Sequence, residues 1–352
     1  MPKKGPDLRV PAPFVFGFRA PSIREEIVTI FRANVNRRFI ARQLNSRMTP
    51  VGVNDLKRGL RVTRRAFVLG TVGVGALGAL GLSATAGYAA GIEAQSLIVT
   101  RYRMTPPGWP AGQRLSITVI ADLHAGGPNM GLARIREVVE VGNFLKSDLI
   151  VLLGDYFATH RFVTERVPHD AWAGELGRLR APLGVYAIYG NHDWWFDFGG
   201  VRDALTRVQI PVLENDAVLL GDSGQRFWLA GLGDQIAIPI SRGVFRGVDD
   251  LPGTLARVRG DEPVILMVHE PDIFPRVPER VSLTLAGHTH GGQIRLPFVW
   301  PSFVPSIYGT RFAYGHIIEG GRHMVVSGGL GTSIVPARLG VPPEIVRIDL
   351  GA

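Results

Sequence analysis

Five clusters of Asp, His and Asn, each placed directly after a short apolar run, constrain the fold of this chain more than any other feature of its sequence. The clusters are Asp122-Leu123-His124, Gly154-Asp155, Gly190-Asn191-His192-Asp193, His269 and Gly287-His288-Thr289-His290. In open α/β sheets, ligands lie beyond the carboxyl ends of the strands. We therefore expect the five strand ends to deliver these side chains to one crevice.

The apolar runs themselves predict buried strands. These strands are expected at 115–121, 148–154, 184–189, 263–268 and 281–286. Apolar positions at helical spacing predict helices over 132–145 and 171–179, and turn residues at 222–225 predict a hairpin between 218–220 and 227–232. Strands that alternate with helices and are followed by hairpin-rich sequence indicate an α/β sandwich with mixed sheets.

The chain contains 352 residues and no cysteine. This composition excludes a disulfide scaffold, a thiol nucleophile and a Cys-ligated zinc or iron–sulfur site. Any bound metal must be held by His, Asp, Asn or Glu. Asp122 and His124 are two residues apart on an extended segment and so point to the same side, as do His288 and His290.

The positive charge of the chain belongs to its N-terminal segment. Residues 1–65 contain fifteen Lys or Arg and four Asp or Glu, a net charge of +11, whereas the rest of the chain contains 24 basic and 26 acidic side chains, a net charge of −2. A nucleic-acid-binding domain would carry its basic residues on the folded body. We therefore expect no nucleic-acid partner.

The same segment has the pattern of an export address. Arg64 and Arg65 precede an uncharged, Gly/Ala-rich run over 66–92 that includes an A-x-A site at 84–86. Paired arginines followed by Phe67 resemble a twin-arginine signal, whose partner is the twin-arginine translocation machinery and which directs a protein out of the cytoplasm. The run is also long enough for a membrane anchor, so a cleaved signal, a retained inner-membrane anchor and a buried Gly/Ala-rich helix stay open.

These patterns divide the chain. We expect residues 1–62 to form a basic N-terminal extension, residues 63–92 the twin-arginine signal or membrane anchor, and residues 95–352 a single catalytic domain. Met48 lies seventeen residues before Arg65, so translation starting at Met48 is an alternative to translation starting at Met1.

The order D-x-H, GD, GNHD, H, GHTH across residues 115–295 resembles that of the calcineurin-like metallophosphoesterases. GHTHGGQIRLP at 287–297 and GLGTS…PARLGVPPE at 329–344 look like the YaeI/YkuE branch, which pairs a twin-arginine signal with a single phosphodiesterase domain and to which the lipid A-pathway pyrophosphatase LpxG is similar. The resemblance runs from about residue 60 to the end. It implies a four-layer α-β-β-α sandwich of two mixed sheets with a dinuclear metal site at the sheet ends.

The resemblance also implies a ligand set for two divalent ions. The first ion would be held by Asp122, His124, Asp155 and His290, and the second by Asn191, His269 and His288, with Asp155 bridging both. Mixed N and O ligands suit Mn²⁺, Fe or Zn²⁺ better than Mg²⁺. Two such ions lower the pKa of a bridging water, and the resulting hydroxide would hydrolyse a phosphodiester or pyrophosphate, which we expect to be an envelope or lipid-linked nucleotide substrate.

His192 has a different implied role, that of the catalytic acid that donates a proton to the leaving oxygen. In the Ser/Thr phosphatase relatives, an Asp three residues after the GD aspartate orients this histidine. Ala158 occupies that position here, which leaves Asp193 as the candidate partner.

Weaker candidates surround these residues. Thr289 and residues 291–293 are expected to shape the loop that carries His290. Trp194 and Trp195 are candidates for an apolar substrate wall, or for packing at the edge of the core. Arg311 and Arg338 are candidates for pairing with a phosphate.

Two other functions remain as alternatives to the exported phosphodiesterase. A metal-dependent nuclease shares the five clusters, but the net charge of −2 outside residues 1–65 argues against it. A non-catalytic binding module on the same fold is disfavoured because every ligand position and His192 are intact.

The export signal generates a prediction. Ligands from five segments assemble only on folding, and a twin-arginine route carries folded, metal-loaded protein. Replacing Arg64 and Arg65 with Lys should therefore leave the protein in the cytoplasm, active and unprocessed. Cell fractionation and immunoblotting measure the outcome. Normal amounts of the double variant in the envelope would show that the arginine pair is a coincidence.

Overall fold

The computed structural model describes residues 83–295 and 304–351. The predicted extension at 1–62 and residues 63–82 of the predicted signal lie outside the described residues. Residues 83–91 are helical and lead through the 3-10 turn η1 (Glu93–Gln95) into the body. Among the described residues, no helix combines the length and apolar character that crossing a membrane requires.

The first of two large sheets has the strand order β1-β13-β2-β3-β4. Its strands are β1 (Ile98–Met104), β13 (Glu344–Leu350), β2 (Leu115–Ile120), β3 (Leu149–Leu152) and β4 (Val185–Ala187). β13 runs antiparallel to β2, and all other neighbours are parallel. The C-terminal strand is thus placed in the interior of the sheet.

The second sheet has the order β11-β12-β10-β9-β6-β5. Its strands are β11 (Gly315–Glu319), β12 (Arg322–Val326), β10 (Val281–Ala286), β9 (Val264–Met267), β6 (Phe227–Gly231) and β5 (Asp216–Leu220). The two outer pairs are antiparallel and the inner pairs are parallel. A separate antiparallel hairpin consists of β7 (Ile238–Ser241) and β8 (Val244–Arg246).

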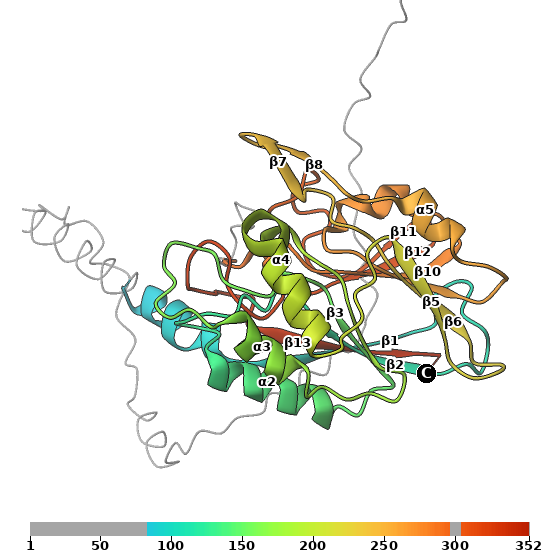
Figure 1. Cartoon of the computed structure of the whole chain (residues 1–352), viewed down its shortest axis with the longest axis horizontal. Helices are drawn as coiled ribbons and strands as arrows, with labels where there is room; N and C mark the ends of the chain where they lie inside the picture. The colour runs from blue at the N-terminus through green and yellow to red at the C-terminus, as the bar shows by residue number, and fades with distance from the viewer. Residues whose placement is uncertain (1–82, 296–303, 352) are drawn as a thin grey trace, which may run out of the picture.

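Helices cover both outer faces, which confirms the predicted α-β-β-α layering. The first sheet is covered by α2 (Leu132–Phe144), α3 (His169–Leu176) and α4 (Asn191–Arg207), and the second by α5 (Leu251–Ala256) and the 3-10 helix η2 (Pro271–Arg276). Figure 1 shows α2 and α3 below the first sheet and α5 above the second.

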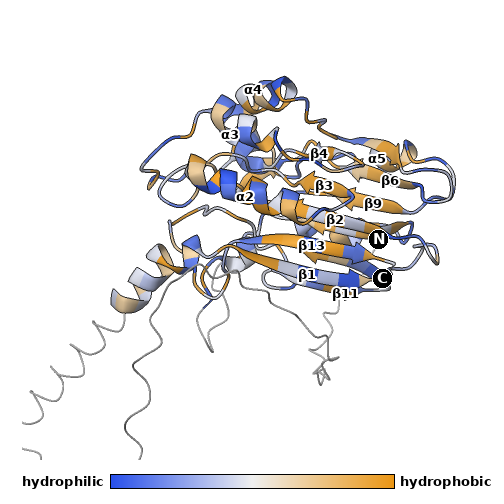
Figure 2. Ribbon diagram, turned by 90° about the horizontal axis from the view of Figure 1, so that it is seen from below, coloured by the Kyte–Doolittle hydropathy of each residue, from blue (hydrophilic) through white to orange (hydrophobic). Residues whose placement is uncertain are grey.

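A large apolar layer lies between the two sheets. Ile117 and Val119 of β2 and Leu149 and Val151 of β3 pack there against side chains of the second sheet such as Ile265. The strands at this interface are mostly apolar in Figure 2. Because inner strands such as β2, β3, β9 and β10 are buried on both faces, they read as continuous apolar runs in the sequence, and this is why they are predictable.

All five predicted strands, both predicted helices and the hairpin β5–β6 are present, with ends shifted by up to three residues. The sequence reasoning did not identify β1, β7, β8, β11, β12, β13, α4 or α5. α4 was missed because it begins within the polar cluster Gly190-Asn191-His192-Asp193, where ligand chemistry masks the helical pattern.

The layer between the first sheet and its helices predicts a stability effect. Trp172 on α3 is fully buried, and its ring stacks 5.3 Å from that of Tyr156. Trp172→Ala should lower the free energy of unfolding by about 3–5 kcal/mol because it leaves a large cavity. Phe144→Ala, at a side chain that is 74% exposed on α2, should change it by about 0.5 kcal/mol or less. Urea denaturation would measure both, and equal effects would contradict the assigned core.

Candidate functional site

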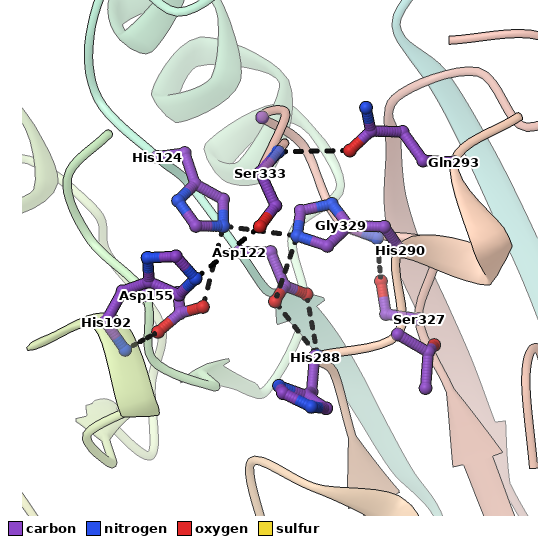
Figure 3. A network of polar contacts seen from close by, with 12 residues as sticks. Asp122, His124, Asp155, His192, His288, His290, Gln293, Ser327, Gly329 and Ser333 are labelled. Atoms are coloured by element: carbon purple, nitrogen blue, oxygen red, sulfur yellow. Dashed lines mark hydrogen bonds and ion pairs between the residues drawn. The ribbon is translucent and has the colours of Figure 1, made fainter. Parts of the chain in front are cut away.

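The ends of β2, β3, β4, β9 and β10 deliver all seven predicted metal ligands to one place. None of the seven side chains belongs to a residue that is more than 8% exposed: Asp122, His124, Asp155, Asn191, His269, His288 and His290. Figure 3 shows the side chains of Asp122, His124, Asp155 and His290 turned toward one another. The crevice expected from the sequence is therefore present.

One group of donor atoms comes mainly from the loops after β2 and β10. The Nε2 atoms of His124 and His290 are 3.1 Å apart. His290 Nε2 lies 3.8 Å from Asp122 Oδ1, and His124 Nε2 lies 3.5 Å from Asp155 Oδ2. These four side chains are the set that the family resemblance implies for one ion.

The second group gathers around an amide oxygen. Asn191 Oδ1 lies 2.9 Å from His288 Nδ1 and 3.1 Å from His269 Nε2. His269 Nε2 is also 3.3 Å from Asp155 Oδ2. Asp155 Oδ2 therefore lies between a histidine of the first group and a histidine of the second.

The loops that carry the candidate ligands adopt unusual backbone conformations and pack closely against one another. Five of the nine non-glycine residues with positive φ among the described residues are candidate ligands, namely Asp122, His124, Asp155, His288 and His290. Such conformations cost free energy and persist where the surrounding structure holds them. A Cβ at Gly154 would lie 2.4 Å from the backbone nitrogen of Gly190, and one at Gly190 would lie 2.4 Å from Asp155 Oδ1. Glycine is thus required at both positions.

Asp193 is not the partner of His192 that the sequence suggested. Its carboxylate is fully buried and accepts 2.9 Å hydrogen bonds from the backbone N–H groups of Asp155, Tyr156 and Gly190. Burial, with the nearby Asp155, raises the pKa of Asp193 to about 7. Its function is to fasten the start of α4 to the loop after β3.

His192 contacts hydroxyl groups instead. Thr159, the residue after Ala158, supplies one contact: its Oγ1 lies 2.5 Å from His192 Nδ1. Ser333 Oγ lies 3.5 Å from Nε2 on the other side of the ring. Burial lowers the pKa of His192. Sequence reasoning missed Thr159 because a hydroxyl one residue away from the family position carries no signal of its own.

The two candidate phosphate-binding arginines have other roles. Arg338 is fully buried and donates to the backbone carbonyls of Gly328, Gly331 and Val341, and its Nη2 lies 3.1 Å from His290 Nδ1. Because a guanidinium can only donate, the neutral His290 ring carries its proton on Nε2 in this arrangement. Arg311 forms an exposed ion pair with Glu319.

The electrostatics of the pocket suit a cation. Burial lowers the pKa of His124 to about 3 and also lowers those of His288 and His290, so these rings are neutral. Burial raises the pKa of Asp122 to about 7. Burial alone would lower the pKa of His269, but the nearby carboxylates, Asp155 foremost, hold it well above its ordinary value. Buried carboxylates and imidazole nitrogens thus converge at one place, and divalent ions fit such a donor set.

His269 also has the second hydrogen bond that is typical of a metal ligand. Its Nδ1 lies 2.6 Å from the carbonyl oxygen of Leu153, to which it donates. That bond orients the ring and directs Nε2 into the pocket.

The acidic residues Glu270 and Asp234 were not identified from the sequence. Donor atoms of His269, Glu270 and His288 all lie within 4.8 Å of one another. Glu270 accepts a hydrogen bond from the backbone N–H of Gln235. The pKa of Asp234 is raised well above its ordinary value, first by burial and then by the charge of the nearby Glu270. The position of Glu270 directly after His269 at a strand end was an available signal.

A cavity of about 980 Å³ opens above these residues. Its floor includes Asp155, Asn191, His192, His288 and His290, and its walls include Phe162, Trp195, Phe196, Ile294, Ile334 and Val335. Trp195 therefore contributes to the predicted apolar wall. Trp194 packs into the core, with its ring 3.9 Å from that of Phe198.

The loop that carries His290 is shaped as expected. Thr289 Oγ1 donates to the carbonyl of Ala313, and the Gln293 amide donates to the carbonyls of Val335 and Ala337. The two Gln293 bonds attach the loop to the segment that contains Ser333 and Arg338.

Comparison with known proteins agrees with this geometry. A family model described as calcineurin-like phosphoesterase matches residues 115–292. The chain is 32% identical over 292 residues to the uncharacterized metallophosphoesterase YkuE of Bacillus subtilis, an alignment covering 82% of this chain and 98% of that protein. It is 29% identical to the phosphodiesterase YaeI of Escherichia coli, covering 66% of this chain and 81% of YaeI.

Among solved structures, a 5′-nucleotidase precursor from Thermus thermophilus aligns with a TM-score of 0.40 and 16% identity, covering 67% of this chain and 54% of that chain. This chain thus spans about half the length of that nucleotidase. The sequence matches confirm the resemblance seen in the five clusters. The chain belongs to the calcineurin-like phosphoesterase family and is a hydrolase that acts on phosphoester bonds.

Proposed function

We propose that the protein is a dinuclear metal-dependent phosphodiesterase or pyrophosphatase that acts on an amphiphilic, lipid-linked nucleotide substrate at the cell envelope. One observation carries the proposal. Asp155 Oδ2 lies between two groups of N and O donors, 3.5 Å from His124 Nε2 and 3.3 Å from His269 Nε2, at the floor of a large cavity.

We assign one ion to Asp122, His124, Asp155 and His290, and the other to Asp155, Asn191, His269 and His288. Divalent ions such as Mn²⁺, Fe or Zn²⁺ would supply Lewis acidity there, which acidifies water and neutralises phosphate charge. Binding of the ions would displace the proton of His269, and neutral imidazole ligands would leave the site able to accept an anionic substrate. Use of His290 Nε2 as a ligand would require the neutral tautomer that carries its proton on Nδ1, and with it a change in the contact between Nδ1 and Arg338.

We assign His192 to the leaving-group side. In the protonated ring, Nδ1 donates to the Thr159 hydroxyl oxygen and Nε2, the nitrogen nearer Ser333, carries the proton to be transferred. His192 can give this Nε2 proton to the oxygen of the departing group and is left as a neutral imidazole. Thr159 then orients His192, as an Asp at the position of Ala158 does in the Ser/Thr phosphatase relatives.

The walls of the cavity support an amphiphilic substrate. Phe162, Phe196 and Ile334 are 40%, 58% and 54% exposed and line the cavity above the polar floor. Arg161 is the one Lys or Arg among the described lining residues, and it lies beside Phe162. A polymer of phosphates would require more cations than this. A phosphate group attached to an apolar portion matches both surfaces.

Envelope localisation in this proposal rests on Arg64, Arg65 and the uncharged run at 66–92, which lie mostly outside the described residues. The relation to the LpxG-type pyrophosphatases likewise rests on the sequence motifs. Both extend the family assignment to a location and a substrate class.

The metal assignment and the reaction are tested together. With Mn²⁺ the protein should hydrolyse bis-(p-nitrophenyl) phosphate faster than p-nitrophenyl phosphate and should not degrade plasmid DNA. Asp155→Asn should lose both ions, measured by mass spectrometry of bound metal, and more than about 100-fold in turnover. Asp203→Asn, on the exposed surface of α4, is the matched control. Two bound ions and near-normal turnover in Asp155→Asn would refute the assignment.

The leaving-group role predicts a pattern across substrates. His192→Ala should keep bound metal but lower turnover by about 10²–10⁴-fold for alkyl diesters, and much less for p-nitrophenyl esters, whose leaving group departs without a proton. Thr159→Val should show the same pattern at roughly tenfold, and Thr159→Ser should retain activity, because one hydrogen bond is at stake. Equal losses for both ester types would count against this role.

A further inference from the structure

The β7–β8 hairpin stands out from the body of the protein (Figure 1). Every residue from 239 to 246 is exposed. The hairpin forms a two-stranded sheet of its own and contacts the body through α4. An isolated hairpin of this length is only marginally stable in water, so its exposed residues invite an explanation.

The exposed side chains of the hairpin combine apolar and basic character. Ile240, Val244 and Phe245 are 59%, 52% and 37% exposed. Arg242 and Arg246 make no ion pair with a described residue, and no Asp or Glu occurs between residues 235 and 248. Arg242 lies at the turn, beside the apolar side chains of the two strands. Such a combination suits the headgroup region of an anionic bilayer, where the apolar groups enter the interface and the cations contact lipid phosphates.

The hairpin is connected to the cavity by one side chain. Trp195 donates from its indole N–H to the carbonyl of Ile236, 2.8 Å away, and its ring stacks on that of Phe245 with a centroid distance of 5.1 Å. The same ring lies 5.4 Å from that of His192 and lines the cavity. The inner side of the hairpin therefore supports the wall of the site.

The exposed apolar residues of the described chain concentrate around this mouth. Of the twelve large apolar side chains that are exposed, seven line the cavity or lie on the hairpin: Phe162, Phe196, Ile240, Val244, Phe245, Ile294 and Ile334. A tip of eight residues is too small for a specific protein interface, which takes about 20–30 residues per partner. Its size and its positive charge favour a lipid surface.

We propose that the β7–β8 hairpin inserts its tip into the headgroup region of an anionic bilayer and holds the mouth of the cavity against that surface. A lipid-linked phosphoester can then pass from the bilayer along Trp195 to the polar floor. Only this last step rests on the proposed function; the membrane contact itself does not require it.

The absence of cysteine makes the contact directly measurable. In the full-length chain, Val244→Cys would carry an environment-sensitive fluorophore at the tip. Phe144→Cys is the matched control, because Phe144 is 74% exposed on α2, on the opposite side of the two sheets. Vesicles of phosphatidylcholine with phosphatidylglycerol should shift the emission at position 244 to the blue and raise it at least about twofold, with little change at position 144.

Variants separate the hairpin from the N-terminal segment, which can itself attach the chain to vesicles. Ile240→Asp, or Arg242→Gln with Arg246→Gln, should abolish most of the change at position 244 while the chain still sediments with vesicles. Hydrolysis of soluble bis-(p-nitrophenyl) phosphate should be unchanged, and hydrolysis of a vesicle-borne phosphodiester should fall. Failure of all hydrolysis would refute the proposed function and leave the fluorescence result standing.

Three results would overturn the membrane contact. They are an equal response at positions 244 and 144, an equal response to pure phosphatidylcholine vesicles, and a change at position 244 that depends on protein concentration without lipid. The last result would show instead that the hairpin contacts a second copy of the chain.

Discussion

The buried carboxylate of Asp155 is the point on which the site depends. Its Oδ1 accepts the backbone N–H of His192, 2.9 Å away, and so holds the first turn of α4. Its Oδ2 faces His124 and His269, which come from the two different sheets. A carboxylate with no exposed surface must be compensated by hydrogen bonds and positive charge. The hydrogen bond from His192 and the neighbouring histidines are therefore what allows Asp155 to be buried.

The candidate ligands have unfavourable backbone conformations, and packing in other parts of the protein stabilises them. Positive φ at Asp122, Asp155 and His290 costs free energy that the apolar layer between the sheets offsets. Arg338 and Asp193 also stabilise the loops that carry the ligands. Arg338 donates hydrogen bonds to backbone carbonyls there, and Asp193 accepts hydrogen bonds from backbone N–H groups. Neither faces substrate, yet both hold the segments that do.

The sequence was most informative where a single constraint, either burial or ligand chemistry, decided the residue type. Inner strands such as β2 and β10 are buried on both faces, so the runs 115–121 and 281–286 stand out without any knowledge of the fold. The metal-ligand candidates were identifiable because a turn has no structural need for two histidines such as His288 and His290. The sequence was least informative where one residue serves two purposes, as in α4, whose first turn supplies both Asn191 and a helix start.

By itself, the sequence determined an α/β sandwich with mixed sheets and the convergence of the five clusters, because these follow from burial patterns and residue chemistry along the chain. The order of the clusters identified the family by resemblance. Only the tertiary structure decided the partners of individual side chains. Asp193 binds backbone amides, Thr159 contacts His192, Arg338 is enclosed by carbonyls, and Trp195 joins the hairpin to the cavity. Such pairings depend on distances between segments that are far apart in the chain, and these distances are set when the two sheets pack together.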